Sequence, residues 1–421
     1  MTRDPEVARP DRADERPGPR AALRVAPYRR WFAAQIFSAS GANTQVVAMA
    51  WIIVSRTHDG VALALLSFLI FVPVLFAGPW AGRVVDRFAR HRILLATQLA
   101  YFVLGAILVV AAVGGFDGIP FLYAVALATG IVTAVDAPAR QIYVQDLLPR
   151  RLIPAAIGLF EVVMNLARVL GPGVAGILLA LGGAVPAFVF NAVAYLPAIW
   201  AVVRNRDVPS FAEPAAPGDG RVSVWAGLGW AVRHPDVLVV LLLAMASGLL
   251  FNLTVSVPLL ADGEFAIGPQ GYGMLIAVFG CGALLGAVRA ATQHTAPPFG
   301  RTLQLAAVTG VLVLASAVAP VWQTFAVGLL LVGGVSIWFV ARANAYVQLA
   351  APAGIRGQVM SIWTMSLMGV SPFLGLLAGW TAQVAGPRAA FSLSGWLFVA
   401  VIAAAAATRL VRRRPLERGD R

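Results

Sequence analysis

Residues 82–92 read Gly-Arg-Val-Val-Asp-Arg-Phe-Ala-Arg-His-Arg, a basic stretch between two hydrophobic runs at about 61–82 and 92–114. Each run is about twenty residues long, which as an α-helix is enough to cross roughly 30 Å of hydrocarbon. The stretch is therefore predicted to be a loop at one membrane surface that joins two membrane-spanning helices.

Composition extends this interpretation to the whole chain. Of the 421 residues, 59% are hydrophobic and 12% are charged, and the mean hydropathy is +0.80. Soluble domains are closer to half apolar and a quarter charged, so a single core could not bury this much apolar surface. The runs also lack the ten-residue alternation of an outer-membrane barrel. We expect an all-α integral membrane protein.

Twelve hydrophobic runs divide into two groups of six. They lie at about 31–55, 61–82, 92–114, 119–139, 154–181 and 184–203, and at about 236–261, 270–291, 301–319, 322–348, 355–382 and 389–410. We expect an N-terminal six-helix bundle at 28–203 and a C-terminal six-helix bundle at 235–410. The cytoplasmic linker between them, 204–234, is predicted to contain an amphipathic surface helix at 222–234. The ends are predicted to be a disordered cytoplasmic tail at 1–27 and a basic cytoplasmic tail at 411–421.

The arginines fix the predicted orientation. All 32 basic residues are arginine, and with twelve crossings and the N-terminus inside, all but three lie on the cytoplasmic side. Arg56 and Arg388 fall in outside loops, and Arg168 lies within a run. Because cytoplasmic loops are enriched in basic residues, this distribution predicts a multi-pass protein with both termini in the cytoplasm.

The residue composition argues against a P-loop nucleotide hydrolase, a disulfide-stabilised fold, a metal site and nucleic-acid binding. Without lysine it has no P-loop, and with a single cysteine, Cys281, it has no disulfide framework. Cys281 is predicted to be a small packing residue facing other helices, and the four scattered histidines make a metal site unexpected. The net charge of +13 is not gathered on one basic face, so nucleic acid is not an expected partner.

An internal repeat supports two halves. Tyr-Val-Gln at 143–145, followed by Pro149, recurs 203 residues later at 346–348, followed by Pro352. Ala175-Gly176 recurs at the same offset as Ala378-Gly379. Both matches fall where two parallel six-helix repeats require them, as in transporters whose halves rock around a central cavity.

The loop at 82–92 resembles the signature loop of the major facilitator superfamily, in which a glycine is followed by an Asp-Arg pair and a basic cluster. The resemblance implies twelve transmembrane helices in two pseudo-symmetric six-helix bundles. It also implies a cytoplasmic gate, for which we predict Gly82, Asp86, Arg87, Arg90 and Arg140. A carboxylate at Asp86 can pair with arginine or lie at a helix N-terminus.

Residues 170–176, Leu-Gly-Pro-Gly-Val-Ala-Gly, are similar to the glycine-proline motif of exporting antiporters in that superfamily. Proline removes a backbone hydrogen bond and glycine permits tight packing, so Gly171, Pro172 and Gly176 are predicted to kink this helix.

Further segments narrow the resemblance; they lie at 71–73, 136–141, 165–172, 233–235 and 356–361. With them the chain is similar to the bacterial exporter family that includes the enterobactin exporter and macrolide and multidrug efflux proteins. This resemblance implies proton-driven export of an amphiphilic compound, such as a siderophore, an antibiotic or another secondary metabolite, across the bacterial inner membrane. The proton gradient would be the energy source, with no cofactor.

Ionisable residues within spans are functional candidates, because a charge in lipid needs a partner. Glu161, Asn165 and Arg168 share one helical face, and Asp136 and Arg140 form an i, i+4 pair. A carboxylate beside an obligate cation can alternate between protonated and paired states, so Glu161, Arg168 and Asp136 are candidates for proton coupling. A static ion-pair network is the alternative.

Polar and aromatic residues in the predicted spans are candidates for contact with the substrate; they are Gln35, Ser38, Asn43, Gln45, Asn165, Asn252, Asn344, Gln348 and Trp363. Hydrogen bonds between helices are an equally good explanation of these residues. The leading hypothesis is a monomeric proton-coupled exporter of a small amphiphilic molecule in the lipid bilayer. An inward-directed transporter is the nearest rival. A membrane-embedded enzyme or a channel has little support, since no ligand pair, catalytic dyad or filter motif is visible.

Overall fold

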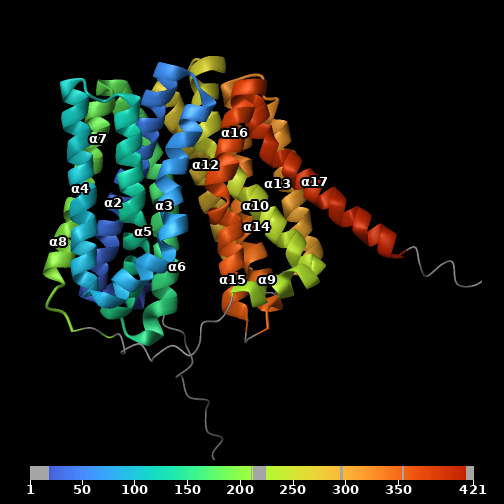
Figure 1. Ribbon diagram of the computed structural model, residues 1–421, viewed down its shortest axis with the longest axis horizontal. Helices are drawn as coiled ribbons and strands as arrows, with labels where there is room; N and C mark the ends of the chain where they lie inside the picture. Colours follow the sequence, from blue (N-terminus) through green and yellow to red (C-terminus); the bar gives the residue numbers. More distant parts are fainter. Residues whose placement is uncertain (1–18, 210, 212–223, 294–296, 353–354, 414–421) are drawn as a thin grey trace, which may run out of the picture.

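The computed structural model describes residues 19–209, 211, 224–293, 297–352 and 355–413. Within these ranges it does not describe the side chains of 77–83, 85–86, 150, 154, 157–158, 161, 224–226 and 408–413. Every regular element of the described residues is helical. Two helical bundles lie side by side, the first half of the chain in blue to green and the second in yellow to red (Figure 1).

Each of the first six predicted spans is helical. The N-terminal half consists of α1 (Pro19–Arg24), α2 (Ala26–Thr57), α3 (Gly60–Arg87), α4 (Arg90–Gly114), α5 (Ile119–Leu147), η2 (Arg150–Leu152), α6 (Ile153–Gly182), α7 (Ala184–Ala194) and α8 (Leu196–Arg204). Short glycine-containing turns separate α4 from α5 and α6 from α7, where Gly115 and Gly183 adopt positive φ angles of 72° and 70°. Such angles favour glycine, which ends these helices sharply.

The second half repeats this order with more interruptions. It consists of α9 (Val224–Arg233), α10 (Pro235–Leu250), α11 (Leu253–Leu259), η3 (Leu260–Glu264), α12 (Gly268–Ala291), α13 (Phe299–Ala317), α14 (Trp322–Ala350), α15 (Arg356–Thr364), η4 (Met365–Gly369), α16 (Ser371–Ala385) and α17 (Pro387–Arg413). The seventh predicted span is broken at Phe251 and Asn252, and the eleventh contains a π-helical turn at η4. The π-helical turn at η4 lies beside Pro372, which cannot donate a backbone hydrogen bond.

Ten helices of the described chain are long and apolar enough to span a membrane, or eleven if the sharply bent pair α9 and α10 forms one span. The described apolar part of α3, Gly60–Phe76, is shorter. The chain is therefore a multi-pass membrane protein, and the count of twelve crossings stays a prediction.

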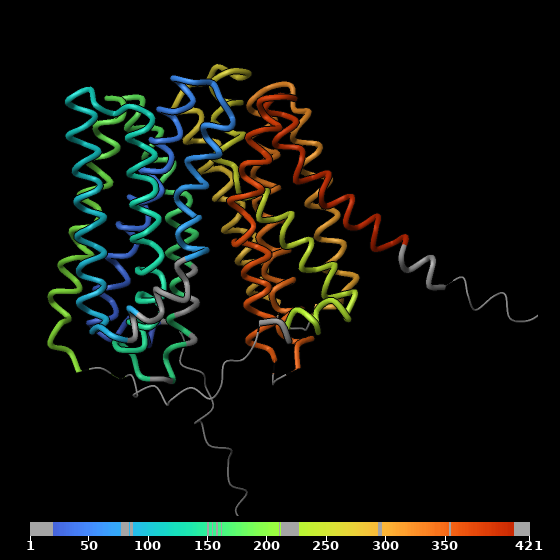
Figure 2. The backbone as a smooth tube through the Cα atoms, viewed as in Figure 1, coloured from blue at the N-terminus to red at the C-terminus, as the bar shows by residue number. Residues whose placement is uncertain are grey.

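The hydrophobic core shows how the two bundles meet. We call the end of the bundles that carries α9 and the ends of α8 and α14 the basic end. At the opposite end one cluster joins both halves and includes Val47, Leu63, Leu250, Tyr272 and Phe391. At the basic end each half has a cluster of its own, around Trp31 in the first half and Trp363 in the second. The backbones converge away from α9 accordingly (Figure 2).

Two sequence expectations differ from the structure. The segment predicted as a structureless tail, 1–27, includes helix α1, whose Ala22 is fully buried, so helical structure begins earlier than predicted. Cys281 is exposed on α12 and does not face other helices, because apolar residues of a membrane protein also line its outer surface. Helix α6 is continuous through Pro172, and the predicted kink there stays a prediction.

Candidate functional site

A buried ion pair lies in the middle of the N-terminal bundle. Asp136 and Arg140 are one turn apart on α5, and their side chains pair directly. Asp136 is only 2% exposed, so its charge depends on neighbouring groups. The predicted i, i+4 pairing is confirmed.

Side chains of two further helices, α4 and α2, form hydrogen bonds with this pair. The Thr97 hydroxyl and the Gln98 amide, both on α4, donate to Asp136 Oδ1 over 2.7 Å and 2.9 Å. On the other side, Arg140 Nη1 donates to the amide oxygen of Gln35 on α2. The carboxylate therefore has donors from α4 and α5, whereas the guanidinium connects α5 to α2.

Further polar contacts lie in the interior of the same bundle. The Tyr101 and Thr133 hydroxyls lie 2.9 Å apart, and the Gln45 amide donates to Thr129 over 3.5 Å. Asn191 of α7 donates to Gln45 Oε1 over 2.7 Å. We call the whole set the polar seam; it consists of Gln35, Gln45, Thr97, Gln98, Tyr101, Thr129, Thr133, Asp136, Arg140 and Asn191. In an apolar bundle, polar side chains gathered in this way offer chemistry to a proton or a polar ligand.

Three of the five residues predicted to form the gate are described with their side chains, and each of these three makes a different contact. The side chains of Gly82 and Asp86 lie outside the described residues. Arg87 is exposed, with its guanidinium 6.0 Å from the ring centre of Phe88. Arg90 at the start of α4 pairs with Asp146 near the end of α5 at 2.6 Å. This pair joins two neighbouring helices at the basic end, and Arg140 belongs to the polar seam instead.

The glycine motif of α6 contacts two different helices. A Cβ atom at Gly171 would lie 2.4 Å from Asn43 Cβ on α2. At Gly273 of α12 it would lie 2.5 Å from the Pro172 carbonyl oxygen and 2.7 Å from Gly176 Cα. Only glycine permits backbones to approach so closely. Residues 171–176 therefore pack the N-terminal half internally and against the second half.

The sequence repeat falls on both crossings between the halves. Gly379, the counterpart of Gly176, packs α16 against Gly60 at the start of α3, where a Cβ atom would lie 2.5 Å from the Gly60 carbonyl oxygen. Helices α3 and α12 hold equivalent places in the two halves. The repeated Ala-Gly pair thus marks the α6–α12 and α3–α16 crossings, a two-fold arrangement of the halves.

Polar contacts also connect the halves at the end away from α9. The hydroxyls of Ser67 on α3 and Thr254 on α11 lie 3.0 Å apart. His58 Nε2 lies 2.9 Å from Asp262 Oδ2. Among the described residues, no hydrogen bond or ion pair connects the two bundles at the basic end.

The predicted cavity residues fall into three environments. Gln35 and Gln45 belong to the polar seam, and Ser38 and Trp363 are buried beside other helices. Asn43 is half-buried and donates to the Ala39 carbonyl. Asn344 is half-buried and Gln348 is exposed, both near the basic end of α14.

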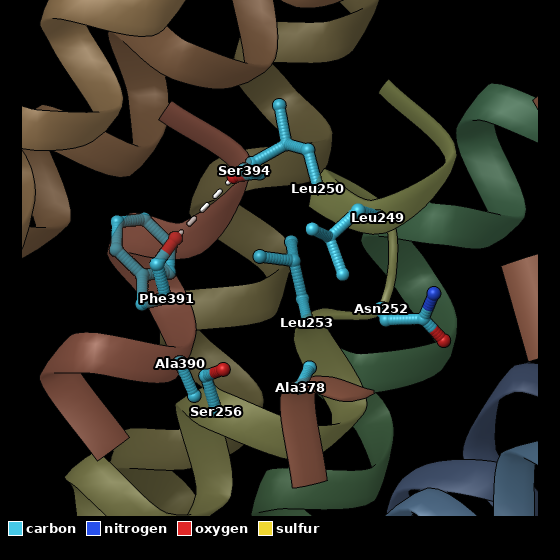
Figure 3. Close-up of a pocket in the computed structure, with 9 residues that line it drawn as sticks. All are labelled: Leu249, Leu250, Asn252, Leu253, Ser256, Ala378, Ala390, Phe391 and Ser394. Atoms are coloured by element: carbon cyan, nitrogen blue, oxygen red, sulfur yellow. Dashed lines mark hydrogen bonds between the residues drawn. The ribbon is translucent and has the colours of Figure 1, made fainter. Parts of the chain in front are cut away.

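Asn252 lies at the break between α10 and α11. It lines a small pocket together with Ser256 and Ser394, with room for about one water molecule (Figure 3). Its amide nitrogen donates to the Gly248 carbonyl and to Ser371, so it connects the two interrupted spans.

Of the three residues on α6 predicted to share a face, two are in contact. Asn165 is buried and its Oδ1 accepts a hydrogen bond from Arg168 Nη1 at 3.2 Å. Arg168 is exposed, and the side chain of Glu161 lies outside the described residues. Among the described residues no group of His, Cys, Asp and Glu could hold a metal ion.

Sequence reasoning missed the α4 side of the seam. Thr97, Gln98 and Tyr101 recur within one helical turn, opposite Thr129, Thr133 and Asp136 at spacings of three and four. This periodicity of polar residues within apolar runs was the available signal, since one face of each helix carries them all.

Comparisons with known proteins agree with this architecture. Residues 18–418 match the family model described as transmembrane secretion effector. The staphyloferrin A transporter of Staphylococcus aureus is 25% identical over 355 residues, covering 83% of this chain and 88% of that protein. The multidrug efflux pump Tap of Mycobacterium tuberculosis is 26% identical over 371 residues, covering 85% and 87%.

A solved structure shows the same fold at low identity. The crystal structure of a bacterial homologue of the iron transporter ferroportin, in an inward-facing state, aligns with a TM-score of 0.66 at 15% identity, covering 90% of this chain and 99% of that one. Because the family model covers nearly the whole chain, the chain belongs to the transmembrane secretion effector family, a group of transporters within the major facilitator superfamily.

Proposed function

We propose that the chain is a monomeric, proton-coupled exporter of a small amphiphilic compound. It would lie in a bacterial inner membrane, with the basic end and both termini in the cytoplasm. The relatives, one of them an efflux pump by name, support export of a small molecule. The excess of arginine at the basic end supports this orientation.

The observation that carries the proposal is the unequal packing of the two ends. The halves share one hydrophobic cluster away from α9 and have separate clusters at the basic end. In an alternating-access cycle this is the packing of a conformation that is closed to the outside and receives its substrate from the cytoplasm. Export then requires the shared cluster to part and the basic end to close.

Coupling to protons would occur at Asp136. In the ionised state its carboxylate holds Arg140 and accepts from Thr97 and Gln98. Arginine stays charged, so a proton on Asp136 would remove the ion pair and leave Arg140 bound only through Gln35 on α2. The proton thereby changes the contact between α5 and α2, which is the link between protonation and helix movement that an antiporter needs.

Uptake into inverted membrane vesicles from an efflux-deficient host tests this proposal. A panel of amphiphilic compounds is offered with and without a proton gradient. We expect accumulation of at least one compound only with the gradient, and its loss when a protonophore is added. Equal passage of every compound under both conditions would refute proton-coupled export.

The Asp136→Asn variant tests the assigned residue. It should lose accumulation driven by the gradient and retain exchange of labelled for unlabelled substrate, because exchange needs no net proton transfer. Asp117→Asn is the matched control, since Asp117 pairs with Arg56 at the opposite end at 2.8 Å. Full gradient-driven transport by Asp136→Asn would remove Asp136 from the mechanism, and Glu161 would then be the next carboxylate to test.

A further inference from the structure

Arg342 on α14 is a buried cation in the second bundle. It is 6% exposed, and its Nε has no hydrogen-bond partner among the described residues. Its Nη1 donates to the Gln293 carbonyl just beyond α12, over a long 3.4 Å. An arginine remains charged even when buried, so this guanidinium has unused hydrogen-bonding capacity.

A second cation and an indole ring lie at the same place. The guanidinium of Arg289, near the end of α12, lies 5.0 Å from the ring centre of Trp338. The Trp338 indole donates to Gln293 Oε1 over 3.3 Å. Gln293 thus contacts both Trp338 and Arg342, and Arg289 lies against the same Trp338 ring, so both cations lie at the adjoining ends of α12 and α14.

The surrounding charges provide no partner. Among the described residues neither Arg289 nor Arg342 forms an ion pair. The acidic residues described in the second half are Asp236, at the start of α10, and Asp262 and Glu264, which pair with His58 and Arg388 at the other end. Two cations near each other without a carboxylate attract an anion from outside the chain.

An exposed apolar surface continues from this cluster along α12. Leu285 is 64% exposed and Val288 is 57% exposed, and both lie on the same helical face as the exposed Cys281. The opposite faces of α12 pack against α6 and α14 through Gly280, Gly282 and Gly286. A ligand that combines an anionic group with a hydrocarbon chain matches both parts of this surface.

We propose that Arg289, Trp338 and Arg342 bind the phosphate of an anionic phospholipid headgroup, with an acyl chain lying along Leu285 and Val288. The guanidinium groups supply charge-assisted hydrogen bonds to phosphate oxygens. Trp338 supplies the amphipathic ring that is typical of the membrane interface. The lipid would thereby join the ends of α12 and α14 in the second half.

Native mass spectrometry of the full-length protein tests this site. Phosphatidylglycerol and phosphatidylcholine with identical acyl chains are titrated onto delipidated protein, and inorganic phosphate is titrated in a parallel arm. We expect phosphatidylglycerol to bind at least about tenfold more tightly than phosphatidylcholine. Arg342→Gln and Arg289→Gln should each weaken phosphatidylglycerol about tenfold, since each removes a charged donor.

Arg301→Gln is the control, because Arg301 is an exposed arginine on α13 at the same end and its loss removes the same charge. Its affinity should stay within about twofold of the unmodified protein. If Arg342→Gln does not fold, the exposed Arg289 still decides the outcome. Equal binding of both lipids, unchanged binding in Arg289→Gln, or displacement of phosphatidylglycerol by millimolar phosphate would each overturn the lipid assignment, the last in favour of a free-anion site.

Discussion

Helices α5 and α14 occupy equivalent places in the two halves, but at equivalent positions α5 buries charged side chains and α14 buries apolar ones. At the repeat offset of 203, Asp136 and Arg140 of α5 correspond to Phe339 and Ala343 of α14. Phe339 is fully buried and packs edge-on against Phe398, with ring centres 5.8 Å apart. The same position in the bundle therefore holds an ion pair in one half and an aromatic core in the other.

The difference shows what two-fold packing does and does not require. Helix crossings need small residues at fixed places, and both halves keep them at Gly176 and Gly379. A buried ion pair adds little or nothing to stability over apolar residues of similar volume, because desolvation offsets the attraction. Its presence in only one half therefore points to chemistry and not to folding.

The largest effect is expected from Asp136→Leu. It leaves Arg140 charged and buried without its carboxylate, so the free energy of unfolding should fall by about 3–5 kcal/mol. Reversible unfolding in mixed micelles measures this. Asp207→Asn, in the exposed Arg206–Asp207 pair, is the control and should change stability by less than about 0.5 kcal/mol. Similar small losses at both sites would mean that the buried pair is screened.

The double variant Asp136→Leu/Arg140→Met replaces the buried ion pair of α5 with apolar side chains, like those at the equivalent positions of α14. It should regain most of the stability lost in Asp136→Leu, because no unpaired charge remains buried. Gradient-driven transport should stay absent, and this separates stability from function. A double variant that unfolds like the single one would show that the polar seam also holds the bundle together.

The two glycine crossings should respond alike. Gly273→Ala and Gly379→Ala each place a Cβ atom 2.5 Å from a carbonyl oxygen, so each should destabilise the closed end by about 1–3 kcal/mol. Gly229→Ala in α9 is the control, since nothing lies within 4 Å of its Cβ position, and it should be neutral or slightly stabilising. Melting temperatures compare the three variants. A lower melting temperature for only one of Gly273→Ala and Gly379→Ala would show that the two crossings are not equivalent.

The smallest effect is expected for Arg342→Met. Because Arg342 has no acidic partner among the described residues, its removal in lipid-free micelles should leave stability within about 1 kcal/mol of the unmodified protein. Arg140→Met should cost several times more by leaving Asp136 unpaired. Unfolding curves of the two variants under identical conditions provide the comparison, and equal losses would mean that Arg342 has a protein partner.

Much of the fold could be predicted from the sequence because spans are set by local composition. Nine of the twelve runs coincide with single helices whose ends differ from the runs by up to eight residues, and the other three are divided. The Ala-Gly repeat fell on the α6–α12 and α3–α16 crossings. Interruptions at Phe251–Asn252 and at η4 were missed, because no run of polar residues marks them in the sequence.

The candidate site was only half predictable. Spacing along α5 placed Asp136 and Arg140 on one face, but it could not show that Thr97, Gln98 and Gln35 face them from α4 and α2. The helical period gives the direction of a side chain relative to its own axis, whereas the neighbour it meets depends on the rotation and crossing of whole helices.

The exposed thiol of Cys281 can report how deeply one face of α12 lies in the bilayer. It is the only cysteine of the chain and lies near the middle of Gly268–Ala291. Maleimides react with thiolates, which hydrocarbon does not support. In intact vesicles Cys281 should resist a membrane-impermeant maleimide and react once the protein is unfolded in detergent. One labelling reaction on the unaltered protein thus reads how deeply this helix face is immersed in the bilayer.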